Sequence, residues 1–86
     1  MPTISEFYGI QVIINFGDHN PPHFHIRYGN HKAVITIETL SIEAGRLPPR
    51  ALNLILEWAT LHKLALRDNW AKAANRQPVQ SITPLE

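Results

Sequence analysis

The stretch from His23 to Thr36 reads HFHIRYGNHKAVIT, and its pattern decides the fold. Apolar and polar side chains alternate from His23 to Tyr28, as they do in a strand with one buried face. Gly29-Asn30 is a two-residue turn signal, and an apolar, β-branched run follows it. The stretch therefore predicts a β-hairpin.

The turn also predicts the register of this hairpin. With two residues in the loop, Phe24 and Ile26 of the first strand face apolar residues of the second. A slip of one residue would move Phe24 and Ile26 to the wrong face of the sheet. The predicted pairs are Tyr28–His31, Arg27–Lys32, Ile26–Ala33, His25–Val34, Phe24–Ile35 and His23–Thr36.

The segments on either side of the hairpin predict the rest of the fold. Residues 10–16 alternate in the same way and indicate another strand, whereas residues 50–75 contain neither proline nor glycine and have one broad apolar face. Such a helix would be about 39 Å long, which is longer than a small sheet can cover, so a bend between Leu64 and Asn69 is an alternative to a straight helix. We expect an α+β fold in which a small antiparallel sheet of three to four strands packs on a long C-terminal helix.

Length and composition predict one soluble domain. The 86 residues are 44% hydrophobic and 17% charged, as in ordinary globular proteins. We expect a single domain over residues 1–86, with a β-sheet half at 1–47, a helical half at 48–76 and an extended tail at 77–86. The tail is expected either to add an edge strand or to meet a partner.

The composition argues against several classes of function. The chain has no cysteine, which excludes disulfides, thiol nucleophiles and cysteine-ligated zinc. No apolar run approaches the roughly 18 residues of a membrane span, and the N-terminus lacks the layout of a signal peptide, so we expect a cytoplasmic protein. The net charge of +1 does not predict a dedicated nucleic-acid-binding surface, although a small RNA contact is compatible with it.

Histidines are concentrated where chemistry is most easily placed. Residues 18–25 read DHNPPHFH, and Arg27 follows. The two prolines stiffen the loop and hold Asp18 and His19 beside the strand. His23 and His25 are two residues apart on a strand, which places them on one face, opposite the apolar face, with backbones roughly 6.5 to 7 Å apart. This pattern predicts an exposed histidine face.

Three interpretations of this face remain open. In the first, His19, His23 or His25 acts as a general acid or base beside Asp18, as in metal-free cleavage of a phosphodiester, while Arg27 stabilises the developing charge. In the second, His23 and His25 bind a divalent metal such as zinc, together with His19 or with Asp18. In the third, the histidines are structural polar residues that solvent or a partner covers.

A combination of short segments resembles a bacterial family whose members are domains of unknown function. Its signature is Asp-His-x-Pro-Pro-His-x-His, which maps onto residues 18–25, and Arg27 follows the signature. The other matching segments are Met1–Ser5, Phe7–Ile10, Arg27–Gly29, Leu56–Trp58 and Asn69-Trp70. The resemblance implies the toxin half of a two-gene toxin–antitoxin pair of the kind called DhiT–DhiA, and it implies a neighbouring antitoxin as partner.

The helical half predicts a core and a contact surface. His62 falls within the apolar arc beside Trp58 and is expected in the core. Leu66 and Trp70 would extend beyond the sheet and stay exposed together with the tail at 79–85. Exposed apolar patches often mark interaction sites, so this surface is expected to form a homodimer or to bind the antitoxin.

Overall fold

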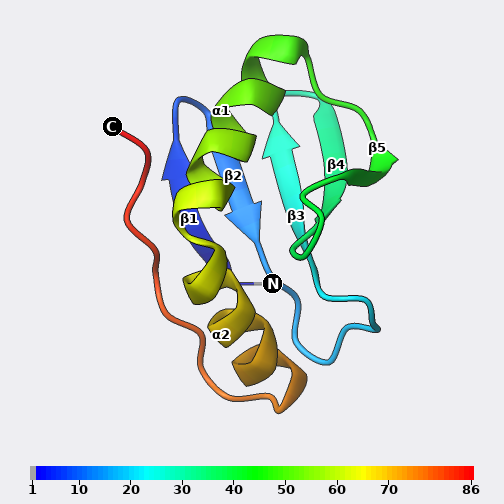
Figure 1. Cartoon of the computed structure of the whole chain (residues 1–86), viewed down its shortest axis with the longest axis vertical. Helices are drawn as coiled ribbons and strands as arrows, with labels where there is room; N and C mark the ends of the chain where they lie inside the picture. Colours follow the sequence, from blue (N-terminus) through cyan, green and yellow to red (C-terminus); the bar gives the residue numbers. More distant parts are fainter. Residues whose placement is uncertain (1) are drawn as a thin grey trace.

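The computed structural model describes residues 2–86 and has an α+β fold. Five strands form one antiparallel sheet in which each strand pairs with the next along the chain (Figure 1). The predicted count of three to four strands is therefore too low, and the tail at 77–86 is not a strand. The strands are β1 (Thr3–Phe7), β2 (Ile10–Ile13), β3 (His23–Tyr28), β4 (His31–Thr36) and β5 (Ile42–Gly45).

The central hairpin has the predicted register. β3 and β4 pair through all six expected partners, from Tyr28 opposite His31 to His23 opposite Thr36. Phe24 and Ile26 consequently point into the core, where they are 0% and 1% exposed. Since side chains alternate along a strand, His25 and Arg27 point to the opposite face of the sheet.

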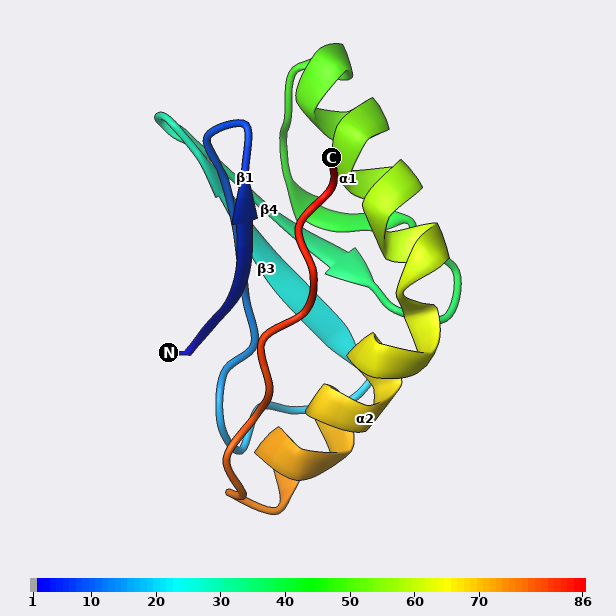
Figure 2. The same ribbon diagram turned by 90° about the vertical axis from the view of Figure 1, so that its left-hand side faces the viewer.

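One face of the sheet is covered by the two helices, α1 (Pro49–Leu61) and α2 (Lys63–Ala74) (Figure 2). The core between them and the sheet is apolar and closely packed, with Trp58 of α1 fully buried beside Phe7 and Phe24. Within residues 2–86, no helix is both long enough and apolar enough to cross a membrane. The opposite face of the sheet is covered by no helix of the described residues.

The predicted single helix is divided in two at His62. The backbone of His62 leaves the helical region, at φ −117° and ψ 25°, and its N–H group caps α1 by donating to the carbonyl oxygens of Trp58 and Ala59. The predicted bend between Leu64 and Asn69 is therefore wrong in position, because those residues lie within α2. His62 is half-buried rather than in the core, with its ring centroid 5.5 Å from that of Trp58.

The expected exposure of Leu66 and Trp70 is wrong. These side chains are 0% and 8% exposed. α2 lies at the end of the sheet, and the C-terminal tail runs along α2. Ile82 of the tail is 7% exposed, and its N–H group donates to the carbonyl oxygen of Ile4 at 2.7 Å. The surface predicted for a homodimer is thus largely buried within its own chain.

Candidate functional site

Asp18 lies on a loop, residues 14–22, that neighbouring elements hold at both ends. The N–H group of Gly17 donates to the carbonyl oxygen of Ala73 in α2 at 3.0 Å. The N–H group of Ile37 donates to the carbonyl oxygen of Pro22 at 3.0 Å. Gly17 has a φ of +63°, a conformation that glycine adopts without a steric penalty. The loop therefore presents the Asp18 carboxyl group to the beginning of β3.

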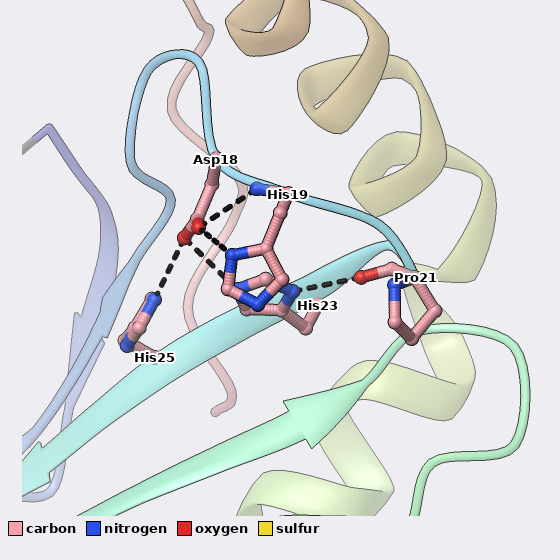
Figure 3. Close-up of polar contacts among 5 residues, drawn as sticks. All are labelled: Asp18, His19, Pro21, His23 and His25. Atoms are coloured by element: carbon pink, nitrogen blue, oxygen red, sulfur yellow. Dashed lines mark hydrogen bonds and ion pairs between the residues drawn. The ribbon is translucent and has the colours of Figure 1, made fainter.

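The Asp18 carboxylate contacts three imidazoles, and we call these four residues the histidine cluster: Asp18, His19, His23 and His25 (Figure 3). Its Oδ2 atom lies 2.9 Å from His23 Nε2 and 3.2 Å from His25 Nε2. Its Oδ1 atom accepts a hydrogen bond from the backbone N–H of His19 at 2.9 Å and lies 3.0 Å from His19 Nδ1. One carboxylate thus organises the whole cluster.

The environment of Asp18 keeps it ionised. Burial by itself raises the pKa of this carboxyl group, whose side chain is only 16% exposed. The contacts that Asp18 makes with His25, the His19 backbone N–H and His23 stabilise the charged form and outweigh that penalty. The pKa of Asp18 therefore lies well below its usual range, and the group is a carboxylate at neutral pH.

His23 is buried, so the predicted exposed histidine face is wrong for this residue. Its side chain is 4% exposed and packs between the rings of Trp70 and His25, with centroids 5.0 and 5.2 Å away. Its Nδ1 atom lies 2.7 Å from the carbonyl oxygen of Pro21. Because a carbonyl oxygen only accepts, Nδ1 is the donor in this contact. His23 therefore fixes Asp18 without reaching solvent.

His25 is both oriented and accessible. Its side chain is 31% exposed, and its Nε2 atom is held by Asp18. Across the described residues 2–86, no protein group forms a hydrogen bond with its Nδ1 atom, which remains free to exchange a proton. His19, at 83% exposed, is accessible, and its ring lies against Asp18 and, at a centroid distance of 5.5 Å, beside the ring of His23. Of the three imidazoles, His25 is therefore the one best placed for acid–base chemistry.

The open face of the sheet is hollowed on two sides of His25. The larger hollow, about 480 Å³, contains Arg27 and Lys32, which lie directly opposite each other on β3 and β4. The smaller one, about 280 Å³, contains the histidine cluster and Glu43. The two hollows share the lining residues His25, Val34 and Ala44.

The structure brings together four of the five predicted acid–base residues. Arg27 is the fifth, and it lies in the larger hollow with no hydrogen bond or ion pair to the cluster within the described part of the chain. For metal binding, the ligand atoms of Asp18, His23 and His25 lie within 4.8 Å of one another, whereas His19 is not in this group.

Two residues of the site were missed from the sequence, Lys32 and Glu43. The register of the hairpin already places Lys32 opposite Arg27, so the pattern contained that signal. Glu43 lies on β5, a strand that the sequence did not predict, and nothing in the pattern pointed to it.

A family model described as Domain of unknown function (DUF4160) matches residues 9–71. The chain belongs to this family. The matched residues run from the beginning of β2 into α2 and include the whole histidine cluster. The DUF4160 match confirms the predicted resemblance to a domain-of-unknown-function family, and its description assigns no activity. No curated protein and no solved structure matches the chain.

Proposed function

We propose that the chain is the toxin half of a bacterial two-gene toxin–antitoxin pair, and that the histidine cluster and its two hollows are the active surface. The toxin role is supported by the resemblance of the Asp-His-x-Pro-Pro-His-x-His signature to such toxins. The location is supported by the structure of that signature, in which every polar residue but one contributes to a single cluster. The exception is Asn20, which is exposed.

The observation that carries the chemistry is the pairing of Asp18 with His25 at the edge of the larger hollow. An imidazole that is oriented by a carboxylate through one nitrogen can exchange a proton through the other, which typically contributes about 10²- to 10⁴-fold to a rate. Arg27 and Lys32, two cations in the same hollow, are suited to a phosphate group. We therefore propose ribonuclease-type cleavage of a phosphodiester.

The step balances with the groups present. His25 Nδ1 takes the proton of the attacking hydroxyl as that oxygen bonds to phosphorus. The bond from phosphorus to the leaving oxygen then breaks, and the leaving oxygen takes up a proton from the imidazolium. Asp18 stabilises the imidazolium that forms between these events, because its carboxylate lies 3.2 Å from His25 Nε2.

The partner in this proposal is the antitoxin encoded next to the chain. Its expected position is over the open face of the sheet, where the hollows and the exposed side chains of Arg27 and Lys32 lie. The alternative is a non-catalytic module in which the same face binds a protein or a metal. The toxin proposal and this alternative use the same fold. They differ in whether removal of the His25 imidazole restores the growth of cells that express the chain.

The test is expression in cells that lack the neighbouring gene. We expect growth arrest with the wild type and with His31→Ala, because His31 is exposed and outside the cluster. We expect normal growth with His25→Ala, and with the wild type when the neighbouring gene is expressed together with it. A wild type without effect on growth contradicts the toxin role. A folded His25→Ala variant that still arrests growth contradicts the acid–base chemistry and favours the non-catalytic module.

A further inference from the structure

The buried ring of His23 faces an acceptor on each side. Its Nδ1 atom lies 2.7 Å from the carbonyl oxygen of Pro21, and its Nε2 atom lies 2.9 Å from Asp18 Oδ2. A carbonyl oxygen and an ionised carboxylate both accept hydrogen bonds and donate none. A neutral imidazole carries one N–H group and satisfies only one of these contacts. The second contact needs either a second proton on a buried ring or a cation between nitrogen and oxygen.

The second of these solutions matches the ordinary surroundings of a metal-binding histidine. Such a histidine donates its other N–H group to a carbonyl or carboxylate, which fixes the tautomer and aims the free nitrogen at the metal. The Nδ1 contact of His23 with Pro21 is of this kind. His23 Nε2 is then the ligand atom, and it points at the carboxylate oxygen that His25 also approaches.

The spacing of the three atoms fits a small cation. Asp18 Oδ2 lies 2.9 Å from His23 Nε2 and 3.2 Å from His25 Nε2, and the three ligand atoms lie within 4.8 Å of one another. At tetrahedral angles, bonds of roughly 2.0 to 2.2 Å from a common metal place neighbouring ligand atoms roughly 3.3 to 3.6 Å apart, so the two nitrogen–oxygen contacts of 2.9 and 3.2 Å need to open by only a few tenths of an ångström. The other oxygen of Asp18, Oδ1, contacts the backbone N–H and the imidazole ring of His19. Oδ2 is therefore left facing the imidazoles of His23 and His25.

We propose that Asp18 Oδ2, His23 Nε2 and His25 Nε2 together bind one divalent first-row transition cation of the Zn²⁺ class. Imidazole nitrogens with one carboxylate oxygen suit this class better than they suit Mg²⁺ or Ca²⁺, which prefer oxygen ligands alone. Three protein ligands leave a coordination position open, as in catalytic rather than structural zinc sites. The smaller hollow beside His25 gives access to that position.

This inference deepens the proposed function, since it names a cofactor for the same site and rests on that function only for its reaction. A cation of this class lowers the pKa of a bound water and so supplies a nucleophile near neutral pH. His25 would then serve as a ligand, and the bound water would take over the proton transfer that a free His25 imidazole performs in the proposed reaction. The metal site therefore requires His25 as a ligand and not as a proton carrier. Binding measurements test that requirement separately from toxicity.

The test is calorimetric titration of the purified protein, free of any affinity tag and stripped with a chelator, with Zn²⁺ at pH 7.5. We expect one ion per chain. His25→Ala and Asp18→Asn should each weaken binding at least about 100-fold, because each removes a ligand while His25 is only half-buried and asparagine keeps the shape of aspartate. His31→Ala should bind as the wild type does. Circular dichroism establishes that each variant is folded.

Two results would overturn the proposal. One is a wild type that binds no Zn²⁺ at unit stoichiometry, and the other is an equal loss of affinity in His31→Ala and His25→Ala. Nitrogen NMR provides a second readout, because it shows whether the His23 ring carries one proton or two. A doubly protonated ring at pH 7.5 in the presence of Zn²⁺ also contradicts the metal site. Stoichiometric Zn²⁺ binding by a protein that does not arrest growth leaves the site standing and contradicts the proposed function instead.

Discussion

The imidazole ring of His23 lies against the indole ring of Trp70, with the ring centroids 5.0 Å apart. This contact joins the first residue of β3 to the buried side of α2. Both side chains are almost fully buried, at 4% and 8% exposed. The histidine cluster and the hydrophobic core therefore share a wall, and the position of Asp18 depends on how α2 packs.

Trp70→Ala is the first prediction, and it tests this shared wall. Removal of a large buried aromatic side chain typically costs about 3 to 5 kcal/mol. The whole stability of a chain of this length is about 0.05 to 0.15 kcal/mol per residue. We expect the urea midpoint of the variant to fall steeply, because the cost is a large fraction of the total of about 4 to 13 kcal/mol. Trp70→Phe retains a ring beside His23 and should lose much less. An unchanged midpoint for Trp70→Ala would show that the indole does not support the core.

Gly45 and Gly29 give a second, matched prediction. Both have a positive φ, +81° and +58°, but a Cβ atom on Gly45 would lie 2.1 Å from the carbonyl oxygen of Lys32, whereas one on Gly29 would meet nothing within 4 Å. Gly29→Ala should therefore cost only the left-handed conformation, about 1 to 2 kcal/mol. Gly45→Ala should cost more and should release β5, which hydrogen exchange of the β5 amides would detect. Equal losses in the two variants would contradict the close approach of β4 and β5.

The parts of the fold that the sequence predicted are those where two independent signals agree. In the central hairpin, the Gly29-Asn30 turn and the alternation of side chains specify the same register, and all six pairs are found. β1 was missed because its register shifts between Thr3 and Ser5, so that Ile4 and Ser5 are both buried and the period of two is lost. β5 was missed because all four of its residues are exposed.

The candidate site shows the same limit. The sequence predicted the members of the histidine cluster, because the residues between Asp18 and His25 are close along the chain. It did not predict the burial of His23, which packs against Trp70, 47 positions away in the sequence and on the helix that follows the break at His62. No proline or glycine marks that break, so local pattern gave no signal for it.

The ion pair between Glu38 and Arg67 gives a third prediction, which concerns pH. Arg67 donates to both carboxylate oxygens of Glu38, at 2.6 and 2.7 Å, and these bonds hold the pKa of Glu38 below its usual value. A lowered pKa in the folded state stabilises the fold above the unfolded-state value of about 4.3. That contribution is lost as the pH falls through the folded-state pKa.

We therefore expect Glu38→Gln to be less stable than the wild type at pH 7 and equally stable in strong acid. The difference should be small, because both side chains are about half exposed, and it should shrink in 1 M salt. Thermal unfolding at several pH values measures it. A difference that is the same at pH 3 and pH 7 would mean that the ion pair is not its source.

Asn69 supports a fourth prediction, about the tail. Its side chain is 2% exposed, donates to the carbonyl oxygen of Gln80 at 2.8 Å and accepts from the N–H group of Gln80 at 2.9 Å. Asn69→Ala removes both hydrogen bonds to Gln80, which is exposed and can turn to water, at a cost of about 0.5 to 1.5 kcal/mol for each bond.

Asn69→Asp should be less stable to denaturation than Asn69→Ala at neutral pH, because it places a negatively charged oxygen against the carbonyl oxygen of Gln80. Its stability should recover as the pH falls, since the protonated carboxyl group can donate where the amide did. Denaturation of the two variants at pH 5 and pH 8 tests this ordering. If the aspartate variant were the more stable one at pH 8, the tail would not be held through the carbonyl of Gln80.

The last prediction concerns the larger hollow and follows from the proposed ribonuclease-type chemistry. Arg27 and Lys32 are exposed and directly opposite each other, so a phosphate between them would meet two cations. Each contact of this kind releases about 0.7 counterion when the partner is single-stranded RNA. Arg27→Ala and Lys32→Ala should therefore weaken RNA binding and reduce the slope of log K against log salt by about 0.7 each. Fluorescence anisotropy with a labelled oligonucleotide measures both effects.

Arg50→Ala is the matched control, because it removes the same charge from an exposed position on α1, across the sheet from the hollow. If all three variants lose the same slope, the RNA responds to net charge alone and does not lie between Arg27 and Lys32.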